Sequence, residues 1–498
     1  MPEGADMSMP STRKSAVRSG IQTAISMLAI SGSAAVAGAL LAQKFGRDAE
    51  TDGFLAAYAI YLVLVLAAQA FRLVVVPDLT RAAAENRLGA ETRGYALTFL
   101  ALAVPVVVLV ALLSGPAGDA LPGGLPQASA DLAGQALVWL VPAAFMQLLA
   151  SLFASALAAR DSYGVAAFGY AGGAVVGLAL FLALADSHGL ISLAWGLVAN
   201  GAFSLGVPAL VLLARGELRG GHASIVGVRV RIAALMRGAA VPLAIQGLYL
   251  ISLRLSAALG VGEVTSLSYA YLLAATLVTA TASALSLVSA ATLTRRGLDD
   301  VTAARHVVHT SWLSLAVIAG AAGVFALVGG RIVRVVLGDA FAGQVGSELG
   351  QLVVAFAPWM FATVAFTVTF PLVFVLERSR FLVAVAIGAL VVHVPVTLAL
   401  REAFGLPGIA LALAVTTFGV LVALMVGVSR RMLTLSAAGL AQLAIVVGAL
   451  AGIAFGVFAL VVGGIPAAIG GFVLYVALLV ALRPRGLREA WTYLRALH

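Results

Sequence analysis

The chain contains no cysteine, which excludes a disulfide framework, a thiolate metal site and a thiol nucleophile. Lysine is nearly absent, since only Lys14 and Lys44 occur, and neither lies in a G-x-x-x-x-G-K-[ST] loop. That absence excludes the usual phosphate-binding loop of nucleotide-driven pumps, so no nucleotide partner is expected. The six histidines form no H-E-x-x-H pair, and His306 and His309 are interpreted as a solvated pair. No metal and no cofactor are therefore expected, and the chain is not predicted to be an enzyme.

Charged residues are also scarce, at 10% of the chain, whereas soluble domains carry about 25%. Hydrophobic residues make up 62%, and the mean hydropathy is +1.09. A membrane-spanning helix needs about 20 apolar residues, because lipid offers no hydrogen-bond partner to the backbone. The sequence predicts an all-α, polytopic membrane protein with about fourteen such segments. They lie near 20–42, 53–77, 94–114, 133–158, 163–185, 189–214, 238–259, 265–291, 310–330, 351–376, 381–400, 405–428, 436–462 and 464–482.

The distribution of basic residues predicts how the segments are oriented. If the N-terminus is cytoplasmic and the segments alternate, 23 of the 30 Lys and Arg residues fall on cytoplasmic pieces and five on outer pieces. The positive-inside rule then places both termini in the cytoplasm and the protein in the cytoplasmic membrane. The net charge of +9 does not indicate nucleic acid, because the arginines are spread between apolar segments and form no patch with interleaved aromatics.

Two stretches of the chain recur at nearly one offset. Gly46 and Thr51 are repeated as Gly260 and Thr265, about 214 residues later, and the Gly-Leu pair at 189–190 is repeated at 405–406. The repeat predicts two pseudo-symmetric six-helix lobes that enter the membrane in the same orientation. Chance similarity between Ala/Leu/Gly-rich segments is the alternative.

The repeat and the segments together give the predicted domain organisation. The chain is divided into a cytoplasmic tail (1–19), an N-lobe with segments 1–6 (20–214), a cytoplasmic linker (215–237), a C-lobe with segments 7–12 (238–430), segments 13–14 (431–482) and a cytoplasmic basic tail (483–498). The linker is read either as an amphipathic helix lying on the membrane surface or as a plain solvated connection.

Polar residues inside predicted spans are the candidate transport residues, because ionisable groups in lipid usually face a cavity or a partner. Arg254, deep in segment 7, is the clearest case, since its planar fork suits a phosphate or diphosphate. The alternative is a structural arginine paired with a carboxylate. Arg72 and Gln246 are further substrate-binding candidates that also fit a snorkelling or interhelical role.

Two more candidates lie at the predicted outer ends of segments 1 and 2. Asp52 is either a helix cap or a substrate contact, and Lys44 is either an interface anchor or a contact.

Several motifs resemble the MviN/MurJ family of lipid II flippases, in the multidrug/oligosaccharidyl-lipid/polysaccharide (MOP) exporter superfamily. These are FG at 45–46, TDGFLAAY at 51–58, LFASALAARDSYG at 152–164, LAWG at 193–196, RLSAAL at 254–259, SLSYAYL at 266–272 and FGLPGIALA at 404–412. The resemblance covers about residues 20–430. It implies two six-helix lobes, a central cationic cavity and two additional C-terminal helices. Asp52 and Arg254 match the family pattern.

The resemblance implies transport of a polyprenyl diphosphate-linked saccharide by alternating access, coupled to the membrane potential or to a monovalent cation. The lipid-linked saccharide and the bilayer are the expected partners, with envelope-synthesis proteins as expected protein partners. The chain departs from the family where Ser31 and Ala37 stand in place of arginines on helix 1, and where Leu272 follows the Tyr-Ala of helix 8. The exact substrate is therefore left open. The alternatives are an exporter of a drug or metabolite with the same fold, and a non-transporting paralogue that acts as a scaffold.

Overall fold

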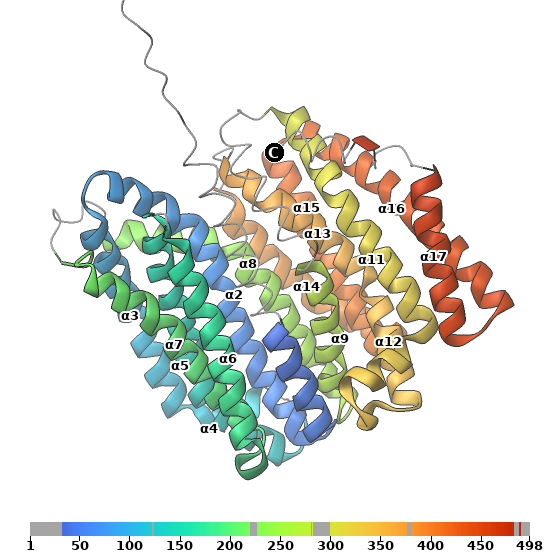
Figure 1. Cartoon of the computed structure of the whole chain (residues 1–498), viewed down its shortest axis with the longest axis horizontal. Helices are drawn as coiled ribbons and strands as arrows, with labels where there is room; N and C mark the ends of the chain where they lie inside the picture. The colour runs from blue at the N-terminus through green and yellow to red at the C-terminus, as the bar shows by residue number, and fades with distance from the viewer. Residues whose placement is uncertain are drawn as a thin grey trace, which may run out of the picture. The chain divides into compact units, whose positions relative to one another are not determined.

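In a computed structural model, the structure describes residues 32–121, 124–160, 162–219, 227–279, 281, 299–375, 380–482 and 488–489. Within these ranges the regular structure is entirely helical, as predicted (Figure 1). Residues 32–45 form the first described helix. The following helices are α2 (Ala49–Ala84), α3 (Leu88–Leu112), α4 (Ser114–Ala120), α5 (Gln127–Ala158), α6 (Tyr163–His188), α7 (Ile191–Ala214), α8 (Val228–Ser256), α9 (Glu263–Val278), α11 (Asp300–Leu337), α12 (Gln344–Ala355), α13 (Ala357–Val375), α14 (Leu382–Phe404), α15 (Leu406–Val428), α16 (Arg430–Val461) and α17 (Gly464–Leu482). Short 3₁₀ turns follow α8 at Ala257–Leu259 and α11 at Asp339–Phe341.

The helices confirm a polytopic membrane protein. Eleven helical spans among the described residues are long and apolar enough to cross a bilayer. The helix at 32–45, α2 and α9 overlap with the remaining three of the fourteen predicted segments. Apolar side chains such as Leu97 and Leu112 of α3 are 67% and 75% exposed. Such exposure fits a lipid-facing surface, because lipid tails solvate leucine as well as a protein core does.

One predicted segment is interrupted. The apolar run 351–376 contains the end of α12 at Ala355 and the start of α13 at Ala357, with Pro358 directly afterwards. A proline disfavours helical backbone in the residue before it and supplies no N–H, so it suits the first turn of a new helix.

The contacts divide the chain into two compact units. Unit 1 comprises 1–38, 60–117 and 134–239, and unit 2 comprises 39–59, 118–133 and 240–498. Residues 39–59 and 118–133 belong to the predicted N-lobe, but they make their contacts with the second half of the chain. The lobe boundaries drawn from the sequence remain a prediction.

Within unit 1, α6 and α7 pack closely along small residues. A Cβ on Gly177 would lie 2.5 Å from the carbonyl oxygen of Gly196, and a Cβ on Gly196 would lie equally close to that of Gly177. The two backbones therefore meet at a pair of glycines. Close backbone approach at small residues is the usual way that membrane helices associate.

The predicted repeat reappears in the backbone. Gly189 ends α6 with φ 60° and ψ −146°, and Gly405 ends α14 with φ 63° and ψ −138°. Positions 189 and 405 are 216 residues apart, the offset expected from the sequence. Positive φ is a conformation that only glycine adopts without strain, which explains why glycine stands at both turns.

Some of the predicted boundaries differ from the helices. α8 begins at Val228, so residues 228–237 of the predicted linker are the first turns of the helix that continues to Ser256. The N-terminal tail (1–19) lies outside the described residues, as do most positions of the C-terminal tail.

Candidate functional site

Arg254 lies in the second half of α8, in unit 2, and its side chain is exposed. Its neighbours Ser252 and Leu253 are buried, so α8 packs with one face and presents Arg254 on another. Arg254 makes no hydrogen bond or ion pair with the described part of the chain. An unpaired guanidinium on a membrane-crossing helix is costly, and such residues usually line a cavity or a substrate path. Arg254 is thus a predicted site residue whose donors are free within the described part of the chain.

Gln246 lies two turns before Arg254 on α8 and borders an aromatic cluster. The Tyr271 hydroxyl donates a hydrogen bond to the Gln246 side-chain oxygen at 3.3 Å. Tyr271 of α9 also stacks on Tyr249, with ring centroids 3.8 Å apart, and contacts Trp359 of α13 at 4.9 Å. Gln246 is half-buried, and its amide nitrogen has no hydrogen-bond partner in the described ranges.

Asp52 lies in the first turn of α2 and is fully buried. One carboxylate oxygen accepts a hydrogen bond from the Gly262 backbone N–H. The other accepts from the Thr265 backbone N–H at 2.8 Å and from the Thr265 hydroxyl. Asp52 thus caps the start of α9, where unsatisfied N–H groups favour a carboxylate. Both of its oxygens are occupied by donors of the protein in this state.

Arg47 also contacts the turn at Gly262 and Glu263. Its Nε donates to the Gly262 carbonyl oxygen at 2.8 Å, and its Nη2 contacts the Glu263 carboxylate at 2.9 Å. Arg47 and Asp52 therefore hold both the N–H and the C=O of Gly262. Arg47 is not among the predicted site residues, although it lies only five residues before Asp52.

These contacts connect the two copies of the sequence repeat. In the first copy, Asp48 accepts a hydrogen bond from the Thr51 backbone N–H at 2.7 Å. At the offset of 214 residues, Thr265 corresponds to Thr51 and Gly262 corresponds to Asp48. Because Gly262 has no side chain, the cap of the second copy comes from Asp52 of the first. We call these contacts of Arg47 and Asp52 with residues 262–265 the inter-repeat clamp.

A hollow of about 330 Å³ lies beside the clamp. Its wall combines apolar and charged groups and is formed by Arg47, Leu259, Glu263, Ser266, Glu348, Leu349, Gln351, Leu352, Gly405, Leu406 and Pro407. Several of these residues belong to turns between helices. The hollow is therefore at a helix end and not at the middle of the spanning segments.

A buried histidine connects three helices of unit 2. His393 of α14 hydrogen-bonds the Ser252 hydroxyl of α8 through Nε2 and the Thr416 hydroxyl of α15 through Nδ1, each at 2.9 Å. Thr416 already donates its own hydrogen to the Ala412 carbonyl, so it accepts from Nδ1–H. The ring of His393 thus links α8 and α15 through α14.

The structure brings together only part of the predicted site. Lys44 is exposed near the end of the helix at 32–45. Arg72 lies within α2, but its side chain is outside those that the structure describes. Arg254, Gln246 and Asp52 all belong to unit 2, and no contact between the three is present among the described side chains. Their shared role in binding remains a prediction.

No protein-family model matches the sequence, and no curated protein sequence matches it significantly. Solved structures do match. One is described as the lipid II flippase MurJ in an inward closed conformation, with a TM-score of 0.69 and 14% identity over 94% of this chain and 99% of that chain. Another is an inward-facing multidrug resistance MATE family transporter of the MOP superfamily, with a TM-score of 0.64 and 13% identity over 84% and 99% of the two chains.

The chain shares the fold of these two structures. The Vibrio cholerae MATE transporter VcmN in its bent form agrees less closely, with a TM-score of 0.53 and 14% identity over 85% of this chain and 99% of that chain. The resemblance drawn from sequence motifs is thus confirmed at the level of fold. These neighbours are described as a flippase and as transporters. At such identities the likeness establishes architecture, and substrate has to be argued from the site.

Proposed function

We propose that the chain is a flippase that moves a polyprenyl diphosphate-linked cell-envelope saccharide, lipid II or a related molecule, across the cytoplasmic membrane by alternating access. The proposal rests mainly on Arg254. Its guanidinium is exposed on the spanning helix α8 and has no protein partner among the described residues. A free, planar guanidinium fork can bind the oxygens of a phosphate or diphosphate bidentately. The fold shared with a lipid flippase supports the same assignment.

The inter-repeat clamp is proposed to close one end of the transport path. It joins residues from the first half of the sequence to α9 in the second half through buried, charge-assisted hydrogen bonds. Alternating access requires such an end to open, which breaks these bonds. Asp52 is proposed to reach substrate only in that open state, because its carboxylate is fully buried and hydrogen-bonded to α9 when the clamp is made.

The other predicted residues complete the proposed path. Gln246 has an unused amide N–H₂ group that can bind saccharide or phosphate oxygens. Arg72 and Lys44 are proposed as additional cationic contacts. Coupling to the membrane potential or to a monovalent cation is proposed as the energy source, and both termini are proposed to be cytoplasmic because the arginines concentrate on that side.

Complementation tests this function directly. The chain is expressed in bacteria depleted of their own lipid II flippase, and growth and outer-leaflet lipid II are measured. Rescue is expected for the parent chain and for Arg254→Lys to a reduced degree, and loss of rescue for Arg254→Ala. Arg81→Ala is the matched control, because Arg81 is 74% exposed and paired with Asp78 at the end of α2. Absence of rescue by an abundant, correctly inserted parent chain overturns lipid II as the substrate.

A drug exporter is the second candidate, favoured by the shared fold with multidrug MATE transporters. Drug-resistance profiles of the same strains separate the two. Resistance that depends on Arg254 without lipid II rescue supports the exporter, and the reverse result supports the flippase.

A further inference from the structure

A long stretch of the chain around the start of α8 carries only positive charge. Between Glu217 and Glu263 there is no acidic residue, while five arginines occur, at 219, 229, 231, 237 and 254. Three of them lie in the first three turns of α8. What this segment can bind therefore depends on which of these guanidinium groups are paired inside the protein and which are exposed.

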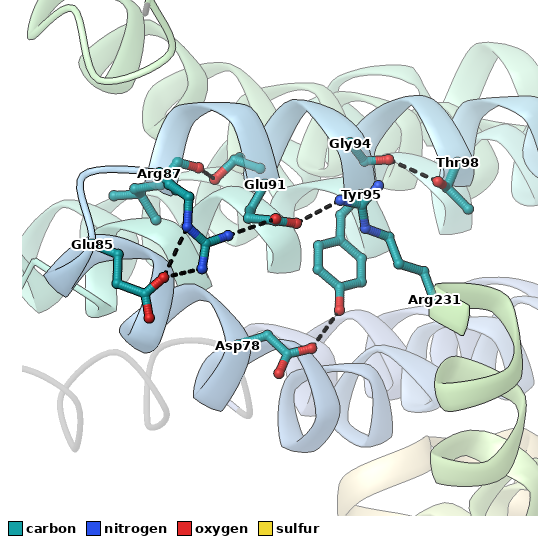
Figure 2. Close-up of polar contacts among 10 residues, drawn as sticks. Asp78, Glu85, Arg87, Glu91, Gly94, Tyr95, Thr98 and Arg231 are labelled. Atoms are coloured by element: carbon teal, nitrogen blue, oxygen red, sulfur yellow. Dashed lines mark hydrogen bonds and ion pairs between the residues drawn. The ribbon is translucent and has the colours of Figure 1, made fainter. Parts of the chain in front are cut away.

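Arg231 is turned into unit 1 and neutralised there (Figure 2). Its Nη2 lies 2.5 Å from the Glu91 carboxylate, and both side chains are nearly inaccessible, at 3% and 4% exposure. The guanidinium also lies over the Tyr95 ring, 4.9 Å from its centroid. Gly94 leaves the room for it, since a Cβ there would come within 2.4 Å of Arg231 Nη1.

The carboxylate that receives Arg231 is itself held in place. Glu91 also pairs with Arg87 at 3.1 Å, and the Tyr95 hydroxyl donates to Asp78 at 2.6 Å. These contacts join the end of α2 and the start of α3 to α8 (Figure 2). A buried ion pair and a stacked ring fix the rotation of α8 about its own axis, because any other rotation removes Arg231 from both partners.

This fixed rotation turns the neighbouring residues outward. At 3.6 residues per turn, Arg229, Met236 and Arg237 lie roughly 160°, 140° and 240° around the helix from Arg231. Their side chains are exposed, as are Val228 and Val230 at 54% and 60%. We call the exposed set Val228, Arg229, Val230, Met236 and Arg237 the basic face of α8.

The two arginines of the basic face are not neutralised by the protein. Arg237 donates through Nε to the Ala233 carbonyl oxygen at 3.1 Å, and Arg229 has no partner among the described residues. By contrast, the exposed Arg160 of the same unit is paired with Glu217. The basic face thus combines free guanidinium groups with exposed valines and a methionine at the end of a membrane-crossing helix. This combination suits the boundary between lipid tails and headgroups, because apolar side chains can contact the tails while the charges reach the headgroups.

We propose that the basic face of α8 binds the headgroups of anionic phospholipids in the leaflet at that end of the helix. The apolar side chains contact the upper acyl chains, and Arg229 and Arg237 bind the phosphates. A basic residue at an anionic membrane surface contributes about 1 kcal/mol, which is roughly fivefold in association. The pair is therefore expected to raise the association constant for an anionic lipid over a zwitterionic one by about 30-fold.

The absence of cysteine makes this measurable on the full chain. Val230→Cys supplies the single thiol for a fluorophore, and the protein is placed in nanodiscs of phosphatidylcholine. Brominated phosphatidylglycerol or brominated phosphatidylcholine is added at equal mole fraction as the quencher. We expect phosphatidylglycerol to quench more strongly, and this preference to weaken at high salt.

Variants separate the proposal from its alternatives. Arg229→Gln with Arg237→Gln is expected to abolish the preference, and the corresponding lysine variants to retain most of it. Arg160→Gln is the matched control and is expected to leave the preference unchanged. Equal quenching by the two lipids in the parent chain, or an unchanged preference in the double glutamine variant, overturns the proposal. No transport is measured, so the outcome is independent of the proposed flippase activity.

Discussion

Replacing Asp52 by alanine is the sharpest test of the inter-repeat clamp. The substitution removes three hydrogen bonds, from the Gly262 N–H, the Thr265 N–H and the Thr265 hydroxyl. The hydroxyl can rotate to another acceptor, but the two backbone N–H groups cannot. A buried donor without a partner costs about 1–3 kcal/mol, and water entering the space left by the carboxylate reduces that cost. A total near 2 kcal/mol is expected against the closed state.

That free energy translates into a population shift. At 1.36 kcal/mol per tenfold change, roughly 2 kcal/mol raises the ratio of open to closed clamp about 30-fold. Double electron–electron resonance can measure it, with Glu50→Cys and Val261→Cys as the only thiols in the chain. Both positions are exposed, Val261 by 49%. We expect one short distance in the parent and a longer population in the Asp52→Ala variant.

Two further variants grade the effect. Asp52→Asn keeps an oxygen for Thr265 but turns an N–H₂ group toward the Gly262 N–H, so an intermediate shift is expected. Thr265→Val removes only the hydroxyl donor and serves as the matched control, with a small shift. A well-folded Asp52→Ala variant whose distance distribution equals that of the parent would refute the reasoning.

Three other predictions concern stability. Glu91→Gln should lower the free energy of unfolding by about 3–5 kcal/mol, because it leaves the buried Arg231 without its carboxylate. Arg231→Met should cost less, because Glu91 keeps its ion pair with Arg87, and in denaturation of the purified protein the double variant should lose less than the sum of the two single variants. His393→Phe should destabilise unit 2 by about 1–3 kcal/mol, because the buried hydroxyls that are hydrogen-bonded to its ring lose a partner. Thermal denaturation in detergent measures this effect, and an unchanged midpoint would contradict the prediction. Hydrogen bonds from the Thr302 side chain and backbone hold the pKa of Asp299 below its usual value of 3.8 at the start of α11. The lowered folded pKa means that this stabilisation is present above pH 3.8 and is lost as pH falls through the folded value, so amide protection at 299–305 should decline there in the parent and not in Asp299→Asn.

The fold was predictable because lipid restricts the choices. A run of about 20 apolar residues bounded by glycine, proline or arginine leaves helix as the only way to satisfy the backbone. The glycines at 189 and 405 made the repeat visible in the sequence, because a positive φ combined with their strongly negative ψ is a conformation of glycine. The break before Pro358 could not be predicted from proline alone, because Pro105 and Pro142 lie inside helices that continue past them.

The site was less predictable because its contacts are long-range. Asp52 and its donor Gly262 are 210 residues apart, and local sequence identifies a capping residue without identifying the helix that it caps. Likewise, the alternating pattern Val-Arg-Val-Arg at 228–231 gives no sign that Arg231 turns inward and Arg229 outward. That choice is made by Glu91, a residue 140 positions away. A signal was available in the repeat, where Gly262 replaces the capping Asp48.

The borrowed cap at Gly262 has a consequence for how the chain is made. Synthesis proceeds from the N-terminus, so the acceptor Asp52 is in place long before Gly262 and Thr265 leave the ribosome. The carboxylate of Asp52 is therefore already available when the first turn of α9 forms. If the second half were produced as a separate polypeptide, the same turn would begin with two bare N–H groups and should fray until the first half is supplied.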